Sequence, residues 1–159
     1  MKLWQKEAAA HEKVDSFTVG KDREYDLVLA QYDCEASMAH AKMLGAIGLI
    51  TTAEAQQLCK VLEALKEDAK KGVFTIENEF EDMHSKIEHV LTEKLGDLGK
   101  KIHTARSRND QVLVAMHLYL KQELTEIKTQ VIALFDLLLE LAEKHQDELI
   151  PGYTHLQVA

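Results

Sequence analysis

The stretch from 110 to 146, DQVLVAMHLYLKQELTEIKTQVIALFDLLLELAEKHQ, contains neither glycine nor proline. Its apolar residues recur every three to four positions, a spacing that places side chains on one face of an α-helix. The residues that follow this spacing are Val114, Leu118, Leu124, Ile127, Val131, Leu134, Leu138 and Leu141. The pattern predicts one helix of about 36 residues, roughly 54 Å long at 1.5 Å per residue. A helix in a globular domain averages only about 11 to 12 residues.

The middle of this helix is apolar on nearly every face. Around Phe135 the sequence reads VIALFDLLLELA, in which Asp136 and Glu140 are the charged residues. A helix that is apolar all round needs several partners to cover it. Two explanations stay open: the helix lies at the centre of a bundle whose other helices this chain lacks, or other subunits cover it.

The rest of the composition also favours an all-α protein. The chain has one proline and seven glycines in 159 residues, whereas proline averages about 5% of residues in proteins. An apolar stripe with helical spacing predicts a first helix over 22–44. Its members are Tyr25, Val28 or Leu29, Tyr32, Ala36, Ala39 and Met43.

Two further helices are predicted by their end signals. Thr51 and Glu54 have the spacing of a capping box at the start of a second helix, which stops at Gly72. The stretch EDMHSKIEHVLTEKLG, 81–96, predicts a third helix with Gly96 as its left-handed C-terminal residue.

Charge and hydropathy exclude several classes of partner. A net charge of −8 argues against nucleic acid, since affinity for the phosphate backbone comes mostly from clustered Lys and Arg. No apolar stretch approaches the roughly 18 to 20 residues that cross a bilayer, and Met1 does not begin a signal peptide. We therefore expect no membrane partner and a soluble, cytoplasmic protein. Cys34 and Cys59 are far apart, and we expect buried free thiols.

Two arginines stand at the start of the long helix, in TARSRNDQV, 104–112. Ser107 and Asp110 have capping-box spacing, which an ordinary helix start explains. Arg106 and Arg108 are not explained in this way, because cations are unfavourable at the positive end of a helix dipole unless an anion neutralises them. Arg108 and Asn109 therefore suggest a carboxylate-binding corner, and the structural and functional interpretations both stay open.

His155 follows Pro151 and Gly152, which we expect to break the long helix and to place Tyr153, Thr154 and His155 in a loop. A histidine beside a hydroxyl group suits proton transfer near neutral pH. A lone histidine is nevertheless more often an ordinary residue, so both interpretations stay open.

A metal site is not expected around His84, Glu88 and His89. The zinc pattern H-x-x-E-H has two residues between its first histidine and the glutamate, whereas three separate His84 from Glu88. The two histidines would lie about 140° apart around a helix and cannot easily share one ion. We interpret Asp82 and His84 as a helix-start pair that supports a site.

Two motifs, HTARSRNDQV at 103–112 and PGYTHLQ at 151–157, flank the long helix. Together they resemble the argininosuccinate lyases, a family of the fumarase/aspartase superfamily whose fumarases and aspartases carry a different first motif. EYDLVLAQYDCEASMAHAKMLGAIGLIT, 24–51, is similar to the family's first core helices, and EFEDMHSKIEHVLTEKLG, 79–96, to its E-D-x-H segment.

The resemblance implies an enzyme that cleaves argininosuccinate to arginine and fumarate, in arginine biosynthesis, with no metal or organic cofactor. It implies that Ser107, Arg108 and Asn109 grip the substrate, that Thr154 contacts it, and that His155 is the catalytic histidine. It also implies a homotetramer in which each active site gathers segments from three subunits. The loop GDLGKKIHTARS before the long helix is the expected boundary, with an N-terminal helical domain, 1–107, and the start of a central helix bundle, 108–159.

The chain departs from the family in two ways. No serine lies between Phe17 and Tyr25, where the family has one in an early substrate loop. Family members are also longer, and their loop with the catalytic serine lies downstream of Ala159. We therefore expect an N-terminal fragment that is inactive alone. Two rival functions stay open: another superfamily lyase, such as adenylosuccinate lyase, and a non-catalytic protein like the related lens crystallins.

Overall fold

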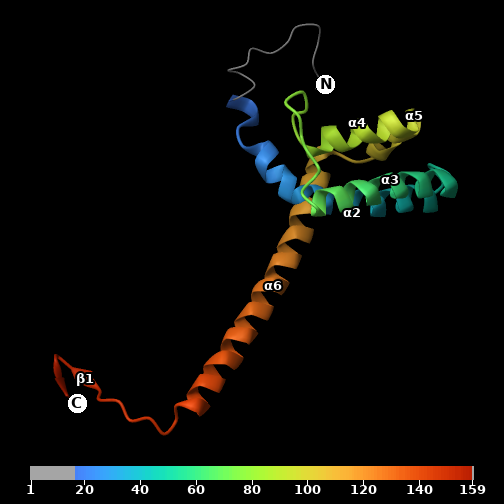
Figure 1. Ribbon diagram of the computed structural model, residues 1–159. Helices are drawn as coiled ribbons and strands as arrows, with labels where there is room; N and C mark the ends of the chain where they lie inside the picture. Colours follow the sequence, from blue (N-terminus) through green and yellow to red (C-terminus); the bar gives the residue numbers. More distant parts are fainter. Residues whose placement is uncertain (1–16, 159) are drawn as a thin grey trace. The chain divides into compact units, whose positions relative to one another are not determined.

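The computed structural model describes residues 17–158 (Figure 1). Its described residues form two compact units, which divide after Leu120. The first unit contains α2 (Asp22–Ala46), α3 (Thr52–Lys70), α4 (Met83–Leu95), α5 (Asp97–Lys100), the 3-10 helix η1 (Lys101–His103) and the start of α6 (Arg108–Lys144). The second unit contains the rest of α6 and the strands β1 (Tyr153–Thr154) and β2 (Gln157–Val158). The all-α prediction is confirmed, because the only sheet among the described residues is this short hairpin.

The predicted helix starts are made by the predicted caps. Thr51 accepts a hydrogen bond from the backbone N–H of Glu54 at 3.2 Å, and Glu54 accepts one from the Thr51 N–H at 2.7 Å, which completes the capping box. Gly96 does end α4 with a positive φ of 59°, but its ψ of −135° lies outside the left-handed helical region. It joins α4 directly to α5.

The apolar stripe predicted for α2 is not the face that this chain buries. Tyr25, Val28 and Met43 of that stripe are 63%, 50% and 40% exposed. The buried residues of α2 are Leu29, Ala30, Asp33, Cys34, Ser37, Met38, Ala41 and Leu44. Most of these are small, and they let α3 approach closely: a Cβ added at Gly45 would lie 3.1 Å from the Cβ of Ala55. Tyr25, Val28 and Met43 therefore fall on the other face, whereas Leu29, Met38 and Leu44 are buried with the small residues.

The core of the first unit lies between α2, α3 and α4, and Leu44, Leu58, Leu62 and Leu91 within it are completely buried. The expectation for the cysteines is confirmed for Cys34, which is free and buried. Cys59 is also free but only half-buried, so its burial was overestimated.

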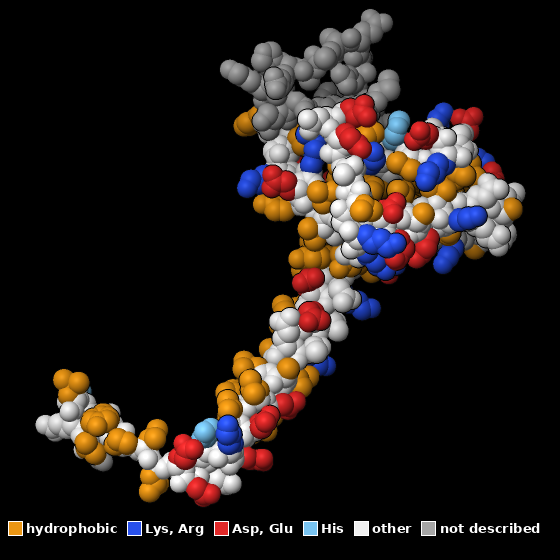
Figure 2. Space-filling view, viewed as in Figure 1, with side chains coloured by type: hydrophobic (Ala, Val, Ile, Leu, Met, Phe, Trp, Pro, Cys, Tyr) orange, Lys and Arg blue, Asp and Glu red, His pale blue; other side chains and the backbone are white. Residues whose placement is uncertain are grey.

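The second unit leaves its apolar side chains exposed. Figure 2 shows hydrophobic side chains along α6, and Phe135 and Leu138 are 60% and 57% exposed. The uncovered surface predicted around Phe135 is therefore present. No helix in the described part of the chain is both long enough and apolar enough to span a membrane.

The end of α6 differs from the prediction. The helix ends at Lys144, before Pro151 is reached, so this proline does not break it. The expected loop is a hairpin in which Tyr153 pairs with Val158 and Thr154 with Gln157. His155 lies in its turn. The predicted domain boundary between residues 107 and 108 stays a prediction.

Candidate active site

The start of α6 is closed by a second capping box. The hydroxyl and the backbone N–H of Ser107 both donate to one carboxylate oxygen of Asp110, at 2.8 and 2.9 Å. The N–H of Asp110 in turn donates to the Ser107 hydroxyl oxygen at 3.3 Å. These hydrogen bonds, led by the one from the backbone, lower the pKa of Asp110. The hydroxyl of Ser107 therefore serves the helix cap, and its contact with a substrate stays a prediction.

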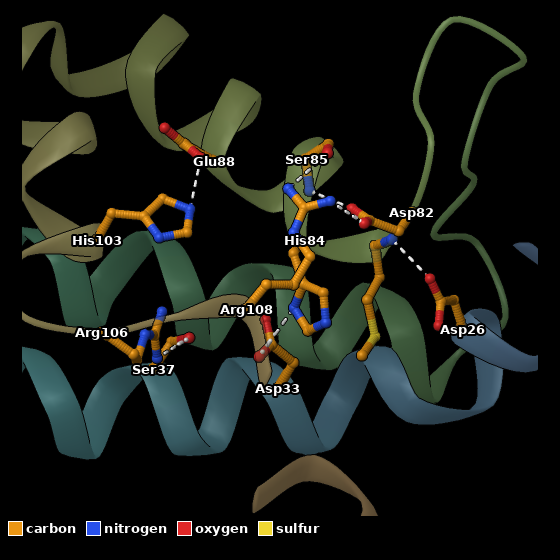
Figure 3. A network of polar contacts seen from close by, with 11 residues as sticks. Asp26, Asp33, Ser37, Asp82, His84, Ser85, Glu88, His103, Arg106 and Arg108 are labelled. Atoms are coloured by element: carbon orange, nitrogen blue, oxygen red, sulfur yellow. Dashed lines mark hydrogen bonds and ion pairs between the residues drawn. The ribbon is translucent and has the colours of Figure 1, made fainter. Parts of the chain in front are cut away.

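Arg108 is held by two residues at the start of α4 (Figure 3). Its guanidinium group forms an ion pair with the carboxylate of Asp82 and donates to the hydroxyl of Ser85 at 3.3 Å. An arginine has five N–H donors, so these contacts leave donors on the guanidinium group for a further anion. The Arg108 side chain is 33% exposed, and Asn109 beside it is exposed. The anion that neutralises Arg108 in this chain is thus Asp82.

Asp82 has two roles. One carboxylate oxygen caps α4 by accepting the backbone N–H of Ser85 at 2.8 Å, and the other contacts Arg108. Met83, the first residue of α4, donates its backbone N–H to the carboxylate of Asp26 of α2 at 2.9 Å. Burial raises the pKa of Asp26 against the effect of this hydrogen bond. The starts of α4 and α6 are therefore joined through one carboxylate.

His84, predicted to support the site, lies inside the first unit. It is 2% exposed, and its Nδ1 is 3.3 Å from Oδ1 of Asp33, a residue of α2 that is completely buried. Figure 3 shows the imidazole ring beside the Asp33 carboxylate, with a dashed line between them. Asp33 is not among the residues predicted for the site. Its signal was a polar pair, Asp33 and Ser37, four residues apart on a helix and therefore on one face.

Arg106 also points into the first unit. It donates to the hydroxyl of Ser37 at 3.1 Å, and burial lowers the pKa of its guanidinium group while the charge of Asp33 opposes this. The loop around it is fixed at two more points. His40 of α2 lies 3.0 Å from the carbonyl oxygen of Thr104, and the ring of His103 lies 2.7 Å from the carboxylate of Glu88.

A groove of ≈ 410 Å³ lies between α2 and the start of α6. Arg106, Asp110 and Gln111 line it, but Arg108 does not. Within residues 17–158, no group of three or more His, Cys, Asp or Glu side chains is arranged to hold a metal ion.

Thr154 and His155 belong to the second unit and are exposed. His155 and Leu156, the two central residues of the hairpin turn, have φ angles of 50° and 64°. Turns with two positive φ angles normally use Asn-Gly or similar pairs. A non-glycine residue held at a positive φ angle costs about 1–3 kcal/mol of backbone strain, and residues of this kind are concentrated at functional sites. The strained turn is thus an independent reason to consider His155 functional.

Comparison with known proteins gives matches over nearly the whole chain. A family model described as lyase matches residues 7–159. An argininosuccinate lyase from Phocaeicola vulgatus is 51% identical over 158 residues, and one from Parabacteroides distasonis is 50% identical over 158 residues. Each alignment covers 99% of this chain and 35% of the relative. An argininosuccinate lyase from Streptococcus suis is 47% identical over 162 residues, again over 99% of this chain and 34% of the relative. The chain spans about a third of the length of these relatives.

Proposed function

Because the chain belongs to the lyase family whose model matches almost its entire length, we propose that it is part of an argininosuccinate lyase. Identity of about half the residues to argininosuccinate lyases, over 99% of the chain, carries the proposal. The active enzyme contains this chain together with the further length that these relatives have. We refer to it below as the full-length enzyme.

The proposed reaction eliminates fumarate from argininosuccinate and leaves arginine. A base removes a proton from the carbon next to a carboxylate, and the electron pair of that C–H bond forms the double bond of fumarate. The C–N bond on the neighbouring carbon breaks, and its electrons leave with the guanidinium nitrogen of arginine, which ends with a proton. Negative charge develops on the carboxylate when the first proton leaves, so fixed donors aimed at that carboxylate stabilise the transition state.

Arg108 and Asn109 supply these donors. The contacts to Asp82 and Ser85 fix the plane of the Arg108 guanidinium group before substrate arrives, and donors that need no rearrangement are the most effective electrostatically. Asn109 adds an orienting amide. Ser107 contacts the substrate from the same helix start, and His84 supports the site from within the first unit, where it contacts Asp33.

His155 transfers a proton, and Thr154 positions the substrate beside it. Histidine suits this role because its ordinary pKa is close to neutral pH. The tight turn holds the His155 backbone in one unusual conformation, which limits the positions that the ring can take. The mechanism uses no cofactor and no metal.

The apolar side chains of α6 that this chain leaves exposed become covered in the assembled enzyme. Exposed apolar patches of this extent are rare on soluble monomers. The full-length enzyme is a cytoplasmic homotetramer, and the chain alone associates but releases no fumarate, since it supplies only part of each active site.

One experiment tests the function directly. Purified full-length enzyme is given argininosuccinate or adenylosuccinate, and fumarate is followed by its ultraviolet absorbance. Release from argininosuccinate alone supports the proposal. Release from adenylosuccinate alone would identify a different lyase of the same superfamily, and release from neither would favour a non-catalytic protein.

A further inference from the structure

The buried face of α2 carries two polar residues where a helix of this kind normally places apolar ones. Asp33 is 0% and Ser37 1% exposed, and their spacing of four residues places both on the same side of the helix. A carboxylate that is removed from water is strongly destabilising unless other groups compensate its charge. The groups around Asp33 must therefore compensate the cost of burying its charge.

Asp33 faces two of the segments that build the arginine site. One is the start of α4, where its Oδ1 lies 3.3 Å from Nδ1 of His84. The other is the loop before α6, where its negative charge is the largest influence that favours the charged form of Arg106. Ser37, one turn further along α2, accepts a hydrogen bond from the same arginine at 3.1 Å. The three elements meet in Figure 3.

The ion pair that fixes Arg108 joins these two segments, since Asp82 stands at the start of α4 and Arg108 follows the loop. His84 stands between Asp82 and Ser85, which contact the Arg108 guanidinium group. Arg106 is two residues before Arg108 in the chain. A displacement of either segment would move the guanidinium group relative to the carboxylate that orients it.

We propose that Asp33 is a positioning residue for Arg108: its carboxylate holds His84 with the proton on Nδ1, while Ser37 on the same face of α2 binds Arg106, and together they keep the starts of α4 and α6 in place. An ionised carboxylate only accepts hydrogen bonds, so it selects the imidazole tautomer whose facing nitrogen carries the proton. Both ring nitrogens of His84 and both carboxylate oxygens of Asp33 are buried and make no hydrogen bond of ordinary geometry, so Asp33 acts on the ring through the 3.3 Å contact between Nδ1 and Oδ1. The inference rests on the proposed function in one respect, that Arg108 grips substrate.

The tautomer of His84 is the property to measure. Imidazole nitrogen-15 chemical shifts distinguish the Nδ1–H from the Nε2–H form, and they are recorded on the 159-residue chain without any substrate. His84→Gln assigns the signals. The substitution Asp33→Asn keeps the size of the side chain, removes its charge and can turn an N–H donor toward the ring. Glu35→Gln is the matched control on the same helix, since Glu35 pairs at the surface with Lys66 at 2.8 Å.

We expect the Nδ1–H form of His84 to predominate in the unmodified chain. In Asp33→Asn the ratio of Nδ1–H to Nε2–H should fall about tenfold or more, which corresponds to about 1.4 kcal/mol. The backbone amide signals of Ser85 and Arg108 should shift in the same variant and stay unchanged in Glu35→Gln. Unchanged His84 signals in a folded Asp33→Asn chain would overturn the proposal.

The measurement stays decisive if Asp33→Asn fails to fold. The unmodified chain alone must show His84 mainly as the Nδ1–H form, and a predominant Nε2–H form there would overturn the proposal without any variant. Since no substrate is used, the result is also independent of the proposed function. Failure of fumarate release would leave the positioning of His84 intact, and the wrong tautomer would leave the lyase assignment intact.

Discussion

Arg108 in the first unit and His155 in the second differ in how firmly this chain holds them. Arg108 contacts Asp82 and Ser85 and stands at the edge of a packed core. His155 is exposed in a hairpin of two residue pairs, in a unit whose long helix leaves Phe135 and its neighbours uncovered. The surroundings of Arg108 are thus organised by this chain itself, whereas we propose that His155 needs further polypeptide to hold it.

The largest loss of activity is expected from a substitution of His155 in the second unit. In the full-length enzyme, His155→Gln should lower kcat for fumarate release by about 10²–10⁴-fold, the usual contribution of a positioned acid–base group. The matched control is His145→Gln, another exposed histidine of the same unit, whose ring pairs with Glu148 at the surface. Equal activity of the two variants would remove His155 from the catalytic group.

The first unit is tested through Arg108. Arg108→Ala should reduce kcat/KM for argininosuccinate by about 10²–10³-fold, as the loss of one fixed donor to a developing oxyanion typically does. Arg108→Lys keeps the charge but loses the planar fork, so we expect an intermediate loss. Lys121→Ala, at an exposed position of α6, is the control. Full turnover in Arg108→Ala would show that the ion pair with Asp82 is only structural.

The same Leu→Ala substitution should also change the free energy of unfolding by different amounts in the two units. Leu62 is completely buried, whereas Leu138 is 57% exposed. In the isolated chain, Leu62→Ala should lower the free energy of unfolding by about 2–5 kcal/mol. Leu138→Ala should change it by less than about 0.5 kcal/mol, as for an exposed residue. Urea denaturation followed by circular dichroism measures both, and similar losses would mean that α6 is already covered in solution.

Self-association gives the complementary measurement. Light scattering should show that the isolated chain forms oligomers through α6, and Leu138→Asp should shift it toward the monomer because a charge is then placed in the apolar contact. A monomeric unmodified chain at high concentration would contradict the expectation that this surface needs a partner.

Much of the fold follows from local signals in the sequence. The capping residues Thr51 and Ser107 fix where α3 and α6 begin, because their hydrogen bonds are made within four residues. The face of α2 that is buried could not be predicted in this way. Periodicity shows that a helix has an apolar stripe, but the partner that covers it decides whether that stripe or the face with Asp33 enters the core of this unit.

The same distinction applies to the site. Arg106 and Arg108 could be singled out from the sequence, because two arginines at a helix start are electrostatically unusual, and the binding of substrate by Ser107, Arg108 and Asn109 stays a prediction. The partners of Arg108 could not, since Asp82 and Ser85 are 26 and 23 residues away in sequence and meet it only through tertiary packing. The spacing of Asp33 and Ser37 places both on one face of α2, but their partners His84 and Arg106 meet them only through tertiary packing.

The smallest expected effect concerns the capping box of α3. The hydrogen bond from Lys101, with those from Thr51, lowers the pKa of Glu54 from 4.5 to about 2. Its charge therefore stabilises the folded chain fully above pH 4.5, and this stabilisation is lost as the pH falls through about 2. Glu54→Gln keeps the capping geometry and removes the charge. Urea midpoints of the two chains should converge as the pH falls between these values, and a constant difference would contradict the assignment.

The central proposal is that Arg108 and His155 both serve the lyase reaction of the full-length enzyme, and fumarate release by that enzyme tests it most directly. Argininosuccinate is supplied to the unmodified enzyme, to Arg108→Ala and to His155→Gln, with ultraviolet absorbance as the readout. We predict fumarate from the unmodified enzyme and at least about a hundredfold less from each variant. No fumarate from the unmodified enzyme, or undiminished release from either variant, would contradict the account.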